Sequence, residues 1–131
     1  MFKDELFPRF KDTDALGHIN HASLVTWFES ARVPIFKLFI PDLDPKKWSL
    51  ILVKIEVEYL KQVPFGAKFN IETEVERIGT SSFVLDQKIK DHDDVLCQSK
   101  CTMVHFDYKD KKSCPIPDPI RKELKKHLIN L

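Results

Sequence analysis

Two long stretches of alternating side chains limit most strongly what this chain can fold into. Between residues 51 and 59, isoleucine, valine and tyrosine alternate with Lys54, Glu56 and Glu58, and a similar alternation runs from residue 69 to residue 76. A strand places successive side chains on opposite faces, whereas a helix repeats every 3.6 residues. The pattern therefore predicts two strands, each with one buried face.

Two more strands and a short helix are predicted further along the chain. Gly79 interrupts the alternation, which resumes over residues 83–89, and a polar turn at residues 92–94 precedes a strand from residue 95 to about residue 108. Four consecutive strands of this kind predict an antiparallel meander. Asp118 as cap and Pro119 as first residue predict a short amphipathic helix at the C-terminal end.

A helix is predicted over residues 21–38, because apolar residues recur there at helical spacing. Asn20 is a suitable N-cap, which directs the first-turn N–H groups toward the polar loop of residues 12–20. Pro34 lacks an N–H and predicts a kink or an early stop. Residues 6–11 predict a short opening strand, confined to an edge by Pro8. The sum is one α+β domain spanning residues 1–131.

Composition excludes several classes of partner. The chain has 21 Lys and Arg against 20 Asp and Glu, so a net charge of +1 supplies no general attraction for nucleic acid. No apolar run approaches the ~20 residues that span a bilayer, and the N-terminus resembles no signal peptide, so we expect no membrane association. Cys97, Cys101 and Cys114 are an odd set without metal spacing, which favours free thiols and a cytoplasmic location.

One segment carries a specific motif. From Arg9 to Arg32 the chain reads RFKDTDALGHINHASLVTWFESAR, and VERIGTSSF follows later. These motifs resemble the single hot-dog acyl-CoA thioesterases, the family that includes 4-hydroxybenzoyl-CoA thioesterase, and the resemblance extends from Phe7 to Leu124. It implies a hot-dog fold, with an antiparallel sheet of about five strands wrapped around a long central helix and a short C-terminal helix. It also implies hydrolysis of an acyl-CoA thioester to free acid and coenzyme A, without a cofactor.

The resemblance transfers three catalytic positions to this sequence: the carboxylate of Asp14, the following Gly17, and the helix-start amide of His21. Thioester hydrolysis needs a carboxylate that activates water or attacks directly, and donors for the developing oxyanion. Helix N-termini carry such donors in the N–H groups of His21 and Ala22. The sequence leaves the base and nucleophile roles open for Asp14, and a plain turn-forming role is the alternative. Asp14, His18 and His21 show no fourth ligand, so no metal is expected.

Coenzyme A requires a second set of contacts. The resemblance implies binding at the turn of Gly79, Thr80 and Ser81, where some relatives have Arg and Lys. This turn has neither, so we expect backbone N–H groups of Gly79 and Thr80 to bind phosphate, helped by Arg77 or Lys61.

Exposed strand edges favour assembly of the chain into a homodimer or homotetramer. Two alternatives to acyl-CoA hydrolysis remain. One is a thioesterase for acyl carrier protein, because the acidic surface of that carrier would bind the lysines near the C-terminal end of this sequence. The other is a non-catalytic acyl-binding domain. The sequence does not determine which acyl group is bound.

Overall fold

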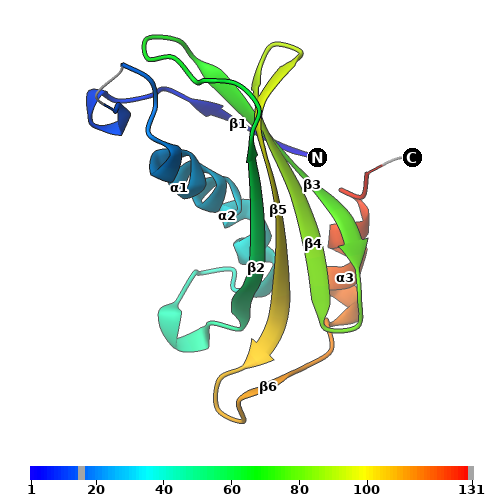
Figure 1. Cartoon of the computed structure of the whole chain (residues 1–131). Helices are drawn as coiled ribbons and strands as arrows, with labels where there is room; N and C mark the ends of the chain where they lie inside the picture. The colour runs from blue at the N-terminus through cyan, green and yellow to red at the C-terminus, as the bar shows by residue number, and fades with distance from the viewer. Residues whose placement is uncertain (15–16, 130–131) are drawn as a thin grey trace.

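The computed structural model describes residues 1–14 and 17–129, and it has a curled antiparallel sheet wrapped around a helix (Figure 1). The sheet order is β1-β3-β4-β5-β2, and a two-stranded extension joins β6 to β5. The strands are β1 (Phe2–Leu6), β2 (Leu50–Tyr59), β3 (Phe69–Ile78), β4 (Ser82–Asp91), β5 (Asp94–Asp107) and β6 (Lys112–Ser113). The predicted α+β class and the four long strands are confirmed, but the predicted four-strand meander is wrong. Only β3, β4 and β5 are consecutive neighbours, because β2 pairs with β5 at the edge of the sheet and not with β3.

The long helix is bent, as Pro34 predicts. It consists of α1 (His21–Ala31) and α2 (Val33–Phe39), which meet at Arg32. Pro34 lies in the first turn of α2, where a missing N–H breaks no helical hydrogen bond. The helix buries Leu24 and Phe28 in one core cluster and Ile35 in another, both against the concave face of the sheet. The bend lets one helix follow the curvature of the sheet over its length.

The predicted N-cap is also confirmed, because the Asn20 side chain accepts a hydrogen bond of 2.8 Å from the Ala22 N–H. We expect Asn20→Ala to lower the free energy of unfolding by about 1 kcal/mol, since the cap satisfies a first-turn donor. Urea denaturation followed by circular dichroism measures this change. Asn20→Asp keeps an acceptor and serves as the control, so equal losses in the two variants would contradict a capping role.

Two sequence predictions of local structure are wrong. The opening strand is Phe2–Leu6 rather than residues 6–11, and residues 10–12 form the 3-10 helix η1 (Phe10–Asp12). The Asp12 carboxylate accepts the Arg9 N–H at 2.9 Å, and this local bond replaces a strand ladder after Pro8. The C-terminal helix is α3 (Asp118–Lys125), whose N-cap is Pro117, so Asp118 is its first residue and not its cap.

The two faces of the sheet differ in chemistry. The concave face holds the core, including Cys97 and Cys101, and burial raises the pKa of the Cys97 thiol to about 11. All three cysteines are free thiols. The convex face carries ion pairs, at Lys54–Glu56, Lys88–Asp86, Lys90–Glu72 and Lys100–Glu76. Among the described residues, no helix is long and apolar enough to cross a membrane.

Candidate active site

A cavity of about 340 Å³ opens at the N-terminal end of α1. Three segments that are distant in the sequence line it: the loop residues Asp14, His18 and Ile19, the first turn of α1, and the chain from the end of β2 to Val63. Asp14, His21 and Lys61, which the sequence analysis proposed for the site, are all in the lining. The fold therefore places a carboxylate, a helix N-terminus and a lysine around one space.

Local hydrogen bonds shape the loop that presents Asp14. The Asp14 N–H donates to the His18 carbonyl at 2.7 Å, and the Asp14 Oδ1 accepts the His18 N–H at 3.2 Å. The Ile19 N–H donates to the Val63 carbonyl at 2.8 Å, which ties the loop to the opposite wall. Gly17 has a φ of 80°, in the left-handed region that favours glycine. Ala15 and Leu16 lie outside the described residues.

The N-cap occupies one of the two backbone donors expected in the first turn of α1. Asn20 already accepts the Ala22 N–H, so that group is occupied by the cap. Within the described part of the chain, no group accepts a hydrogen bond from the His21 N–H. Helix N-termini carry about half a positive charge, and the His21 N–H lies at this end of α1.

Tyr59 is a lining residue that the sequence analysis did not single out. Its hydroxyl donates to the His21 carbonyl at 3.3 Å, and the two rings meet edge to face at 6.1 Å. Burial and the nearby Cys97 raise the pKa of Tyr59, so its hydroxyl stays protonated as a donor. Its place at the end of an alternating strand predicted a buried side chain, but 49% of Tyr59 is exposed. Its contact with α1 depends on the curl of the sheet.

Lys61 and Asp12 have defined partners. The Lys61 ammonium contacts both carboxylate oxygens of Asp94, at 2.7 and 2.8 Å, at the rim of the cavity. Asp12 is 5% exposed and pairs with Arg9, and its carbonyl accepts the Asn20 N–H at 2.6 Å. Asp12 therefore holds the base of the loop.

The turn proposed for coenzyme A lies at the other end of the sheet. Arg77 lies near the end of β3, and Gly79, Thr80 and Ser81 follow the strand. The ten residues of β3 span roughly 30 Å at about 3.3 Å per residue. β3 starts at the end of the sheet where α1 begins, so its own end lies at the opposite end of the sheet (Figure 1). The structure brings Asp14, Gly17, His21 and Lys61 together at one end of the sheet. Arg77, Gly79, Thr80 and Ser81 lie at the other end.

Contacts at this turn also change which groups can bind phosphate. The Gly79 N–H donates to the Ser82 carbonyl at 2.7 Å, so it is already occupied. Arg121 of α3 reaches the turn and donates to the Thr80 carbonyl at 3.1 Å. This cation was not predicted from the sequence, because only tertiary packing brings α3 beside the turn.

Among the described residues, no group of three His, Cys, Asp or Glu side chains is placed to hold a metal ion.

A curled antiparallel sheet around one bent helix, with a cavity at the helix N-terminus, defines a hot-dog-fold protein of the thioesterase class. A predicted thioesterase from Bacillus stearothermophilus has the same fold, with a TM-score of 0.94 and 35% identity over 99% of this chain and 98% of its own. Residues 8–124 match the model of the Thioesterase-like superfamily, and the chain belongs to that superfamily. The hot-dog fold and the thioesterase family predicted from the sequence are confirmed.

Two curated relatives carry names that state a reaction. The acyl-CoA thioester hydrolase YbgC of Escherichia coli is 27% identical over 120 residues, which cover 88% of this chain and 90% of that protein. The 1,4-dihydroxy-2-naphthoyl-CoA hydrolase of Prochlorococcus marinus is 28% identical over 125 residues, covering 86% of this chain and 79% of that protein. Both names describe hydrolysis of a coenzyme A thioester.

Proposed function

We propose that this chain hydrolyses acyl-CoA thioesters to a carboxylic acid and coenzyme A in the cavity at the N-terminus of α1. The observation that carries the proposal is that the Asp14 carboxylate and the first turn of α1 line one cavity. A carboxylate and an electropositive helix end are the two components that thioester hydrolysis requires. The activities that the relatives' names state support the same reaction.

The proposed roles follow from charge development in the reaction. Attack on the thioester carbonyl moves negative charge onto its oxygen, and the His21 N–H at the helix end stabilises that charge. Asp14 either deprotonates the attacking water or attacks the carbonyl carbon itself, and both routes use the same carboxylate position. The Tyr59 hydroxyl bonds the His21 carbonyl and so holds the first turn of α1 in place.

We propose further that the active unit is a homodimer joined through β2. This strand pairs only with β5 among the described strands and exposes 56% of Val53 and 49% of Tyr59. Exposed apolar edges associate unless they are covered. A two-fold axis at Ile55 would set Ile55 beside its copy and Lys54 opposite Glu56, which matches apolar with apolar and positive with negative. The convex face of the sheet is charged, which favours edge-to-edge pairing of two subunits over face-to-face stacking of their sheets.

This dimer would also reunite the separated parts of the site. In antiparallel pairing of β2 with its copy, the Leu50 end of one strand lies beside the Tyr59 end of the other. The turn at Thr80 of one subunit then approaches the Asp14 cavity of its partner. Substrate binding across two subunits would explain why one chain holds the proposed catalytic and coenzyme-binding residues at opposite ends.

The test is a panel of short, long and aromatic acyl-CoA substrates, with released thiol measured by a chromogenic reagent. We expect turnover of at least one of them. Presenting the same acyl group on acyl carrier protein decides between the two carriers. Binding of acyl-CoA without release of thiol across the whole panel would overturn the proposal and favour a non-catalytic acyl-binding domain.

A further inference from the structure

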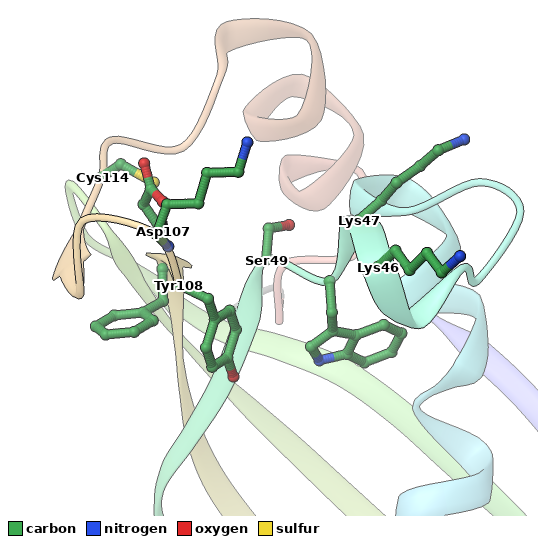
Figure 2. Close-up of a pocket in the computed structure, with 9 residues that line it drawn as sticks. Lys46, Lys47, Ser49, Asp107, Tyr108 and Cys114 are labelled. Carbon is green, nitrogen blue, oxygen red and sulfur yellow. Dashed lines mark hydrogen bonds between the residues drawn. The ribbon is translucent and has the colours of Figure 1, made fainter.

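A second cavity, of about 290 Å³, lies at the end of the sheet away from Asp14. It separates the 3-10 helix η2 (Pro45–Lys47) and the start of β2 from the end of β5. Figure 2 shows Lys46 and Lys47 on one side, Asp107 and Tyr108 on the other, and Ser49 between them. The other lining residues are Trp48, Phe106, Lys109 and Cys114. Aromatic and lysine residues therefore line this cavity together.

The aromatic side chains are held by contacts with the body of the protein. The Tyr108 hydroxyl donates to the Leu50 carbonyl at 2.7 Å, and the Tyr108 ring meets Phe106 edge to face at 5.0 Å. Trp48 packs edge to face on Phe36 at 5.4 Å. Rigid aromatic walls suit a flat heterocycle such as a purine, because stacking needs a ring surface that does not have to be ordered on binding.

The charges in the cavity favour an anion. Lys46 and Lys109 form no ion pair within the part of the chain that the structure describes, and Lys47 pairs with the exposed Asp42 at 2.8 Å. The one carboxylate of the lining, Asp107, accepts the backbone N–H groups of Lys109 and Asp110 at 2.8 and 3.2 Å. These bonds lower its pKa and commit it to the turn. The lining thus contains three lysines and one carboxylate.

The position of the cavity links it to the proposed active site. It adjoins Leu50, at the opposite end of β2 from the Asp14 cavity, and β2 spans roughly 30 Å. In the proposed dimer, the two β2 strands run antiparallel, so the Leu50 end of one strand lies beside the Tyr59 end of the other. The basic cavity of one subunit is then the neighbour of the Asp14 cavity in the other.

We infer that Lys46, Lys109 and the surrounding aromatic residues bind the adenosine 3′,5′-bisphosphate end of coenzyme A while the partner subunit hydrolyses its thioester. This inference rests on the proposed function and on the proposed dimer. A purine matches the aromatic walls, and phosphate groups match the ammonium groups. The assignment also supplies the cations that the turn of Gly79, Thr80 and Ser81 lacks.

The test compares one acyl group on coenzyme A and on pantetheine, which has no nucleotide. In the Lys46→Ala/Lys109→Ala variant we expect KM for acyl-CoA to rise about tenfold, as loss of two exposed charge contacts implies. We expect kcat with acyl-CoA and kcat/KM with acyl-pantetheine to stay as in the wild type. Lys122→Ala/Lys125→Ala on α3 is the control with the same charge change, and it should leave KM unchanged.

Calorimetric titration with adenosine 3′,5′-bisphosphate tests the cavity independently of turnover. We expect binding to the wild type and to the α3 control, and about tenfold weaker binding to Lys46→Ala/Lys109→Ala. Equal binding to all three proteins, or an equal change of KM for both thioesters, would overturn the inference. Failure of the wild type to hydrolyse either thioester, with the calorimetric difference intact, would instead remove the proposed function.

Discussion

Replacing Asp14 by asparagine is expected to lower kcat for acyl-CoA by about 10² to 10⁴, the usual contribution of a general base. Asparagine retains a side-chain oxygen that can accept the His18 N–H, so the loop should keep its shape. Asp14 is exposed, and the thermal midpoint of unfolding should therefore stay near that of the wild type. Released thiol measures turnover, and calorimetry measures the midpoint.

The matched control is Asp12→Asn, two residues earlier in the same loop. Asp12 is buried and bonded to Arg9, so this change should reduce stability much more than the intrinsic rate. Wild-type turnover by Asp14→Asn, at an unchanged midpoint, would remove Asp14 from the mechanism. A single turnover of the wild type in oxygen-18 water separates its two routes, because label enters the Asp14 carboxylate only through a covalent intermediate.

Placing a charge at Val53 is expected to have the next largest effect. Val53 is an exposed bulge residue of β2, and the other subunit covers this edge in the proposed dimer. A carboxylate buried there without a partner costs several kcal/mol. Val53→Asp should therefore give a monomer by light scattering at micromolar concentration, with turnover reduced about tenfold or more. The loss of activity follows because the acyl-CoA site is proposed to draw on both subunits.

Val53→Thr provides the control for this change, since threonine is isosteric and keeps the strand preference of a β-branched residue. It should remain a dimer with nearly unchanged turnover. Val53 is exposed within one chain, so neither change should prevent folding of the subunit. A fully active monomer carrying Val53→Asp would contradict both the dimer and the shared site.

Local patterns predicted the elements of the fold well. The alternation around Lys54 and Glu56 predicted β2 to within one residue, and Pro34 predicted the bend of the helix. The misplaced first strand shows the limit of such patterns. There, a side-chain bond from Asp12 to the Arg9 backbone formed a 3-10 turn, and short polar contacts of this kind leave no periodic signal.

The proposed site was only partly predictable. The motif around Asp14 indicated the loop and the helix start, and both do line one cavity. The sequence could not show that Tyr59 contacts His21, that the cap occupies the Ala22 N–H, or that Arg121 reaches Thr80. Each of these depends on residues brought together from distant parts of the chain.

The sequence alone determined which residues form strands and helices, which faces are apolar, and which loop carries the candidate carboxylate. These properties depend on side chains a few residues apart, so periodicity and capping report them directly. Only the tertiary structure decided that Asp14, Tyr59 and Lys61 share a cavity while Thr80 lies at the far end of the sheet. Such proximity depends on strand order, register and curl, which arise from packing across the whole domain.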